Sequence, residues 1–171
     1  MSWRTLFDLA GFQLVWWSCA LGASYGRSTP GILAAAAFVA IQTTIRWQSI
    51  ELYRTILIAG VFGLAAESLL AACGLVQYAA AWPSHHLVPA WIVALWLAFG
   101  TTVETMHRLL GSRPFLTALL LGAIGGPLAY LAGASVGALS LPTPSGPSLL
   151  VIAAIWGGLS RRCWRCTRAD R

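Results

Sequence analysis

Six apolar segments separated by arginines constrain this chain more than any other feature of its sequence. The segments cover residues 9–26, 30–45, 55–78, 88–106, 114–139 and 148–160. If each segment crosses a membrane, ten of the eleven arginines fall on one face and Arg27 alone falls on the other. Cytoplasmic loops of multi-spanning proteins carry this excess of positive charge. The pattern therefore predicts six transmembrane helices with both termini in the cytoplasm.

The composition agrees with a membrane protein. The chain is 58% hydrophobic and 9% charged, whereas a soluble domain has about 25% charged residues. A soluble fold of this size could not bury so much apolar surface. Backbone inside a bilayer must satisfy its own hydrogen bonds, and the period-two alternation of a β-barrel is absent. We expect an all-α polytopic bundle in which residues 1–171 form one domain and residues 161–171 a short basic tail.

The net charge of +6 does not indicate a nucleic-acid ligand, because of where the charge lies. Five of the eleven arginines occupy the last eleven positions, directly after an apolar segment. Such clusters fix membrane topology and contact anionic lipids. The expected partners are therefore membrane lipids and no nucleic acid. A homo-oligomer and a membrane enzyme are both left open as protein partners.

Motifs for metal or cofactor chemistry are absent from the sequence. Cys163 and Cys166 form one CxxC in the basic tail, whereas a structural zinc site needs four ligands and no second pair exists. There is no GxSxG, HExxH, P-loop or dinucleotide fingerprint. The sequence predicts no metal and no cofactor, leaves the catalytic residues unknown, and favours a protein that is not an enzyme.

Glu67 is the most informative polar residue. It follows Arg54 by 13 residues, about 20 Å along a helix, which predicts a position near the bilayer midplane. A carboxyl at that depth costs at least about 2.5 kcal/mol, so it should face the bundle interior. Pro127 frees the carbonyl of Ala123 at a similar height. We expect a neutral Glu67 to donate to that region, either as a structural bond or as a functional site.

Further polar residues are expected near the cytoplasmic edge. Counting from the charged helix ends predicts one layer from three helices, formed by Gln13, Gln42, Thr101 and Glu104. His107 and Arg108 follow Glu104 at the helical spacing for a local ion pair, which is favoured over a proton relay. The candidate functional polar residues of the membrane interior are therefore Glu67, Glu104, His107 and Gln42.

Small residues recur along the segment 114–139. Gly122 and Gly126 are four apart, as are Ala129, Gly133 and Gly137. This spacing allows two helix backbones to approach closely. We expect these glycines, together with Pro127, to pack against neighbouring helices, with Gly126 and Gly133 touching backbone, and this helix to lie at the centre of the bundle.

One stretch of the chain resembles a known family. The sequences concerned are Ala66-Glu67-Ser68, Pro89-Ala90-Trp91, Leu95 to Phe99, and the run GAIGGPLAYLAGASVGAL from Gly122 to Leu139. They resemble the bacterial inner-membrane domain-of-unknown-function family twenty-eight seventy-eight. The resemblance implies a small multi-pass proteobacterial protein, often encoded beside enzymes resembling cyclopropane-fatty-acid synthase.

These observations favour an integral inner-membrane protein accessory to envelope lipid (fatty-acid) modification. The alternative is a small transporter or the substrate-binding membrane subunit of one. That alternative needs an outward-facing polar pocket, for which the outer half of the chain offers only Gln77, Tyr78, His85 and His86. An enzyme acting on acyl chains has the least support, because it would rest on Glu67, Glu104, His107 and Tyr130.

Overall fold

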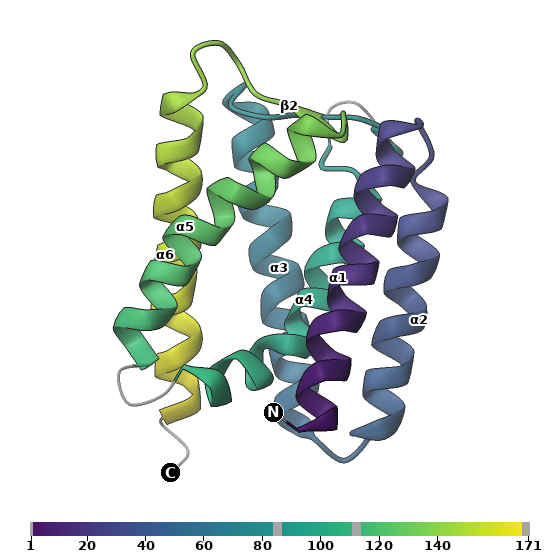
Figure 1. The fold of residues 1–171 in the computed structure, drawn as a ribbon, viewed down its shortest axis with the longest axis vertical. Coiled ribbons are helices and arrows are strands. Elements are labelled where there is room, and N and C mark those ends of the chain that lie inside the picture. Colours follow the sequence, from purple (N-terminus) through teal and green to yellow (C-terminus); the bar gives the residue numbers. More distant parts are fainter. Residues whose placement is uncertain (1, 84–86, 111–113, 169–171) are drawn as a thin grey trace.

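The computed structural model describes the backbone of residues 2–83, 87–110 and 114–168, with side chains at 2–83, 87–110 and 116–158. Its fold is all-helical (Figure 1). The six helices of the described chain are α1 (Trp3–Ser24), α2 (Thr29–Ile45), α3 (Ile50–Ala72), α4 (Ala90–Leu109), α5 (Pro114–Ser135) and α6 (Gly146–Arg168). Two short strands, β1 (Gln77–Tyr78) and β2 (Leu139–Ser140), pair antiparallel. His85 and His86 lie outside the described residues.

Two helices are shorter than their apolar segments predict. The segments 55–78 and 114–139 were expected to be helical throughout, but α3 ends at Ala72 and α5 ends at Ser135. Each is followed by a glycine in the left-handed region, Gly74 at φ 67° and Gly137 at φ 81°. A glycine in this conformation ends a helix and lets the next amides satisfy its last carbonyls. The apolar residues beyond it then form β1 and β2.

Two other helices are longer than predicted. α1 begins at Trp3 rather than at residue 9, because the hydroxyl of Ser2 caps it by accepting from the amide of Thr5 at 3.2 Å. α6 continues to Arg168, so most of the predicted tail is helical. The side chains of Cys163 and Cys166 lie outside the described ones.

The helices form two packing units. α4 packs against α1, α2 and α3, and α1 packs against α2, whereas α5 packs mainly against α6. In Figure 1 the α5–α6 hairpin stands beside the other four helices, and the β1–β2 pair joins the two units at one end. The prediction that α5 is the central helix is wrong. α4 takes that place, since its Trp91, Trp96 and Ala98 are at most 4% exposed.

The closest approaches between helix backbones also differ from the prediction. A Cβ built on Gly31 would lie 2.6 Å from the Cα of Cys19, and one on Gly100 would lie 2.6 Å from the Cα of Ile56. These glycines bring α2 onto α1 and α4 onto α3. In contrast, a Cβ on Gly126 would meet the indole of Trp156 at 2.6 Å, and one on Gly133 would meet the side chain of Leu139 at 3.2 Å. The space beside both glycines is filled by side chains rather than by backbone.

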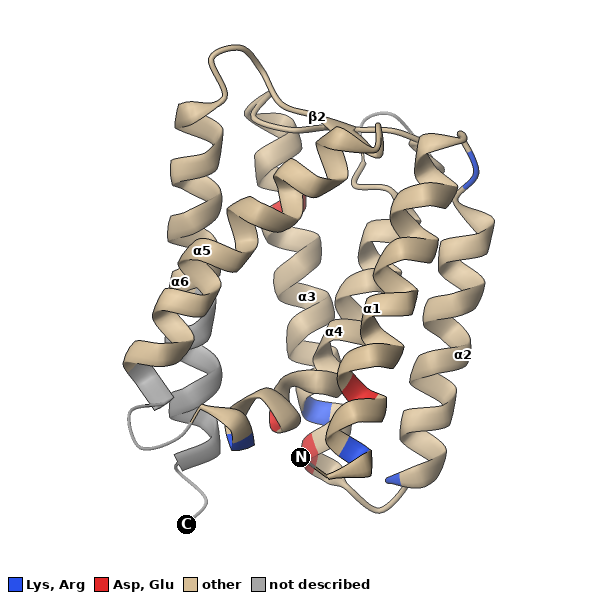
Figure 2. Ribbon diagram, in the orientation of Figure 1, with Lys and Arg blue, Asp and Glu red and all other residues tan. Residues whose placement is uncertain are grey.

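Three helices in the described part of the chain are long and apolar enough to cross a membrane: Trp3–Ser24, Ile50–Ala72 and Leu116–Ser135. The helices Thr29–Ile45 and Gly146–Gly158 are apolar but shorter. Figure 2 shows that charged residues gather at the end where α1 begins and α6 ends, and that one basic residue lies at the opposite end. That residue follows from the chain order as Arg27, in the connection between α1 and α2.

Candidate functional site

Glu67 lies in the later part of α3 and is buried, with 2% of its surface exposed. The prediction that it faces the protein interior is confirmed. α3 ends five residues later, about 8 Å away. Gly63, one turn earlier on the same face, leaves room for the ring of Trp96, since a Cβ there would lie 2.1 Å from Cγ of that ring.

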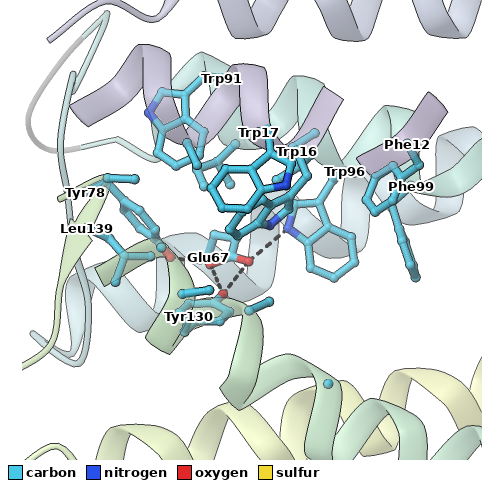
Figure 3. Close-up of a pocket in the computed structure, with 18 of the residues that line it drawn as sticks. Phe12, Trp16, Trp17, Glu67, Tyr78, Trp91, Trp96, Phe99, Tyr130 and Leu139 are labelled. Carbon is cyan, nitrogen blue, oxygen red and sulfur yellow. Dashed lines mark hydrogen bonds between the residues drawn. The ribbon is translucent and has the colours of Figure 1, made fainter. Parts of the chain in front are cut away.

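The carboxylate of Glu67 accepts hydrogen bonds from three side chains (Figure 3). The hydroxyl of Tyr130 lies 2.6 Å from both carboxylate oxygens. The indole Nε1 of Trp96 donates to Oε1 at 2.9 Å, and the hydroxyl of Tyr78 donates to Oε2. The indole of Trp96 can only donate, so Oε1 is an acceptor, whereas a tyrosine hydroxyl can both donate and accept. The prediction that Glu67 donates a hydrogen bond to the region of the Ala123 carbonyl is wrong.

Each donor comes from a different element. Trp96 lies on α4, and Tyr130 lies on α5, one turn after Pro127. Tyr78 is 11 residues from Glu67, so on a continuous helix it would lie about 16 Å away. The turn at Gly74 brings it back, and β1 is held there by pairing with β2 and by the amide of Ala79, which donates to the carbonyl of Ala138 at 2.9 Å.

Tyr78 lies in the strand outside the long helices, and its environment keeps it protonated. Burial, followed by the neighbouring charge of Glu67, raises the pKa of Tyr78 above its ordinary value. The hydroxyl therefore remains a donor to Glu67 at neutral pH. Sequence reasoning named Tyr78 and Tyr130 only in passing, because neither the position of β1 nor the angle of α5 is visible in the hydropathy pattern.

A cavity of about 350 Å³ lies next to this cluster. Its walls come from α1, α3, β1, α4, α5 and α6 and are mostly aromatic. The aromatic residues, apart from the two tyrosines, are Phe12, Trp16, Trp17, Trp91, Trp96, Phe99 and Trp156. Glu67 supplies the carboxylate. A largely apolar pocket of this size with a few convergent polar groups is the usual form of a small-molecule site.

A second cavity of about 390 Å³ continues from the first. Both are lined by Phe99, Gly125 and Trp156. The second cavity lies between the later part of α4 and the earlier part of α5, and it reaches His107. The two lie side by side along α5, whose residues from Thr117 to Gly133 line one or the other, a stretch of about 24 Å. His107 was predicted to take part in a local ion pair with Glu104, but in the structure it lines this cavity.

The opening of the first cavity lies between α1 and α5. Gln13 and Trp17 on α1 and Gly125 on α5 line the cavity and are exposed, with Trp17 at 42%. A Cβ on Gly125 would meet no atom within 4 Å. Gly125 is midway along α5, so the opening lies at mid-helix and faces sideways.

A polar network occupies the charged end of the bundle (Figure 2). Arg46 donates to Oε2 of Glu104 at 3.2 Å, to Oε1 of Gln42 at 3.0 Å and to the carbonyl of Thr101 at 2.8 Å. Arg108 donates to the other oxygen of Glu104 at 2.6 Å. Three members of the predicted layer are thus brought together, and the predicted pair of Glu104 with Arg108 is confirmed. Gln13 is not part of the layer, because it lies at the opening of the first cavity.

Asp8 is the member of this network that the sequence did not indicate. It is 5% exposed, and it accepts from Nε2 of Gln42 at 2.7 Å and from the hydroxyl of Thr105. The signal available was its spacing, since a helix that begins at Trp3 turns Asp8 and Val15 to the same face. A pocket of about 500 Å³ opens beside Asp8, Arg4 and Arg46.

Other predicted site residues have structural positions. Gly122 lines the second cavity, and Gly137 ends α5 rather than packing within it. Pro127 lies inside α5. Among the described residues, no group of three His, Cys, Asp or Glu side chains could hold a metal ion. Cys19 is buried, and Cys73 is exposed.

The fold and the site define an all-helical protein that has three helices suited to crossing a membrane. It also has an aromatic cavity with one carboxylate in its wall. The chain belongs to the family described as protein of unknown function (DUF2878), whose model matches residues 5–161. The match extends beyond the stretches that carry the resemblance and covers most of α1, all of α2 and most of α6. No curated protein and no solved structure matches the chain.

Proposed function

We propose that all six helices cross the bacterial inner membrane, with both termini in the cytoplasm. The charged end in Figure 2 supports this topology, because Arg4, Arg46, Arg54 and Arg108 lie there by chain order and Arg27 lies opposite. The last turns of α4 carry Glu104, His107 and Arg108, which lower its mean hydropathy, but the rest of the helix is apolar and packs against α1, α2 and α3. The short helix α2 is accommodated by local thinning of the bilayer and by Arg46 at its end.

Within that membrane, the protein binds a lipid in the aromatic cavity, as an accessory to envelope lipid (fatty-acid) modification. The observation that carries this proposal is the sideways opening between α1 and α5, lined by Gln13, Trp17 and Gly125. An opening at mid-helix faces the hydrocarbon core, so a lipid enters without passing through water. A membrane enzyme that acts on the bound lipid is the protein partner this function implies.

Apolar contact alone cannot hold a lipid in the cavity. Lipid tails are as apolar as the cavity wall, so transfer between them releases little free energy. Selectivity therefore rests on the shape of the aromatic wall and on the cluster of Glu67, Tyr78 and Tyr130. These are the polar side chains that converge on the cavity away from its opening.

Filling the opening tests the proposal. Gly125→Leu places a side chain where a Cβ meets no atom within 4 Å, so it should fill the space shared by both cavities without disturbing the fold. Gly158→Leu is the matched control, because Gly158 on α6 is equally open and lines neither cavity. Mass spectrometry of lipids retained after purification should show a loss for Gly125→Leu and none for Gly158→Leu. Equal retention in both variants contradicts a lipid site in this cavity.

A small transporter, or its substrate-binding subunit, is the second candidate. It is favoured by the position of Glu67, about 8 Å from the outer end of α3, and by Tyr78, which reaches the cavity from the β1–β2 pair. A transporter must expose its site to each side in turn. Uptake or efflux by reconstituted vesicles that is lost in Glu67→Gln supports transport, whereas lipid retention without flux supports the accessory function.

A further inference from the structure

We infer that the ligand of the aromatic cavity is an amphiphile with a quaternary ammonium group, held beside Glu67, and an alkyl chain. The inference deepens the proposed function and rests on it, since it names the chemical class bound at that site. Three properties of the cavity lead to this class: its charge, the nature of its wall, and the hydrogen bonds already made by the carboxylate.

The cavity contains one acid and no matching base. The carboxyl oxygens of Glu67 lie within hydrogen-bonding distance of Trp96, Tyr78 and Tyr130, and none of these side chains carries a positive charge. Among the described residues, its only partners are neutral side chains, and none of the residues lining the first cavity is an arginine or histidine. A buried carboxylate is stabilised by a nearby positive charge. A cationic ligand supplies that charge.

The wall of the cavity fits a cation that has shed its water. The rings of Trp96 and Trp156 stack at 4.8 Å, and Phe99 packs against both, at 5.6 and 5.5 Å. Trp16 and Trp17 of α1 line the same cavity (Figure 3). Aromatic faces attract cations within about 6 Å, and quaternary ammonium groups are recognised in this way because their charge is weakly hydrated.

The hydrogen bonds of Glu67 distinguish a quaternary ammonium from a primary amine. A carboxylate has about four lone-pair positions. Three donor groups already occupy about three of them: Trp96 donates to Oε1, Tyr78 donates to Oε2, and the single hydroxyl proton of Tyr130 lies between the two oxygens. A primary ammonium has three N–H groups, so Glu67 could accept from only about one of them unless a donor of the cluster were displaced. A quaternary ammonium has no N–H and is attracted by charge alone, so it leaves the cluster intact.

The second cavity fits the alkyl chain. It is lined by Val103, Met106, Leu110 and Leu121, among other apolar residues, and it joins the first cavity at Phe99, Gly125 and Trp156. A headgroup beside Glu67 therefore directs its chain along α5 toward His107. The two cavities extend along about 24 Å of α5, more than half of the roughly 30 Å hydrocarbon core, so together they have the length for a long alkyl chain.

The test compares three probes with one decyl chain: decyltrimethylammonium, decanol and decyl sulfate. Binding to the purified full chain in maltoside micelles is followed by quenching of tryptophan fluorescence and by calorimetry. We expect the cation to bind at least about tenfold more tightly than decanol, because the charge of Glu67 acts in a poorly solvated site. Decyl sulfate should bind more weakly than decanol.

Variants assign the effect to Glu67. Glu67→Gln should reduce the affinity for the cation to that for decanol. The control Glu51→Gln removes an exposed charge from the same helix and should leave the affinities for the cation and for decanol unchanged. Trp17→Leu is a second variant, at an exposed position, and it should lower the affinity for the cation more than the affinity for decanol. Thermal unfolding of each variant checks its fold.

The outcomes separate this inference from the proposed function. If decanol binds as tightly as the cation, or if the preference for the cation survives in both Glu67→Gln and Trp17→Leu, the ammonium class is wrong and the lipid site stands. If none of the three probes binds and Gly125→Leu retains its lipid, the proposed function itself is wrong.

Discussion

A single methyl group added at Gly63 tests how α3 and α4 build the site. In the structure a Cβ at this position would lie 2.1 Å from Cγ of Trp96 and 2.4 Å from Cδ2. These atoms are at the base of a rigid ring that is 4% exposed and stacked on Trp156. Because Trp96 cannot rotate away, Gly63→Ala must push α3 from α4 or move the indole that donates to Glu67.

The magnitude follows from two opposing effects. Overpacking of a buried site costs about 1–3 kcal/mol, and replacing glycine by alanine within a helix returns about 1 kcal/mol. The net cost is about 0–2 kcal/mol, and we expect Gly63→Ala to fall in its upper half, because a Cβ 2.1 Å from the base of a fixed ring is a severe overlap. Gly60→Ala is the control on the same face of α3. Its Cβ meets the terminal Cδ2 of Leu97 at 2.6 Å and Cγ at an ordinary 3.5 Å, and the flexible end of this side chain can rotate.

The assay is reversible unfolding in mixed micelles, with increasing dodecyl sulfate and helix content followed by circular dichroism. Gly60→Ala should match the parent to within about 0.5 kcal/mol, since an off-rotamer Leu97 costs about as much as the helix gains. Gly63→Ala should unfold at a lower fraction of dodecyl sulfate. If both variants unfold together with the parent, the tight contact between Gly63 and Trp96 is refuted.

Four further predictions concern packing, polar networks and topology. Gly126→Leu should destabilise the protein by about 1–3 kcal/mol, because its Cβ meets the base of Trp156 at 2.6 Å; an unchanged melting profile would mean that this face is open. Asp8→Ala should cost about 1–3 kcal/mol in unfolding experiments, because Gln42 and Thr105 lose their buried acceptor, and a stability equal to that of the parent contradicts the network. Glu67→Leu should be less stable than Glu67→Gln by at least about 1 kcal/mol, since three donors are left unpaired; the reverse order refutes the cluster. Reporter fusions at both termini should report the cytoplasm and one at His85 the periplasm, and a periplasmic C-terminus would remove α6 from the set of spans.

Hydropathy and arginine positions were enough to locate all six helices. The starts of α2 and α4 agree with the prediction within two residues, because Pro30 and Pro89 mark them. The ends of α3 and α5 were missed, because the residues after them remain apolar and only the left-handed conformations at Gly74 and Gly137 stop the helix. A glycine after a long apolar run is a readable signal for a helix end, and giving it more weight than hydropathy would have corrected both ends.

The site was predictable in part. Burial of Glu67 followed from the cost of a carboxylate in a membrane, but its partners did not follow from depth alone. Tyr78 reaches the carboxylate because the chain reverses after α3, and Tyr130 does so because of how α5 lies against the bundle. Similarly, Gln42 and Glu104 were placed at the correct level by counting, whereas Arg46, which joins them, was assigned only to topology. Relative angles and turns are set by tertiary packing, which a single helix pattern does not contain.

The double role of Glu67 follows from how the α5–α6 hairpin is held. α5 packs mainly against α6, so contacts to the four-helix unit are few, and they include the bond from Tyr130 to Glu67 and the stack of Trp156 on Trp96. The same carboxylate therefore helps to set the distance between α1 and α5 and lines the cavity that opens between them. A ligand that approaches Glu67 without displacing Tyr130 leaves the hairpin in place, whereas one that takes over the bond releases it. On the proposed function, occupancy of the cavity and the position of α5 are therefore coupled through one side chain, and the structural role of Glu67 is a condition of the binding role that we propose for it.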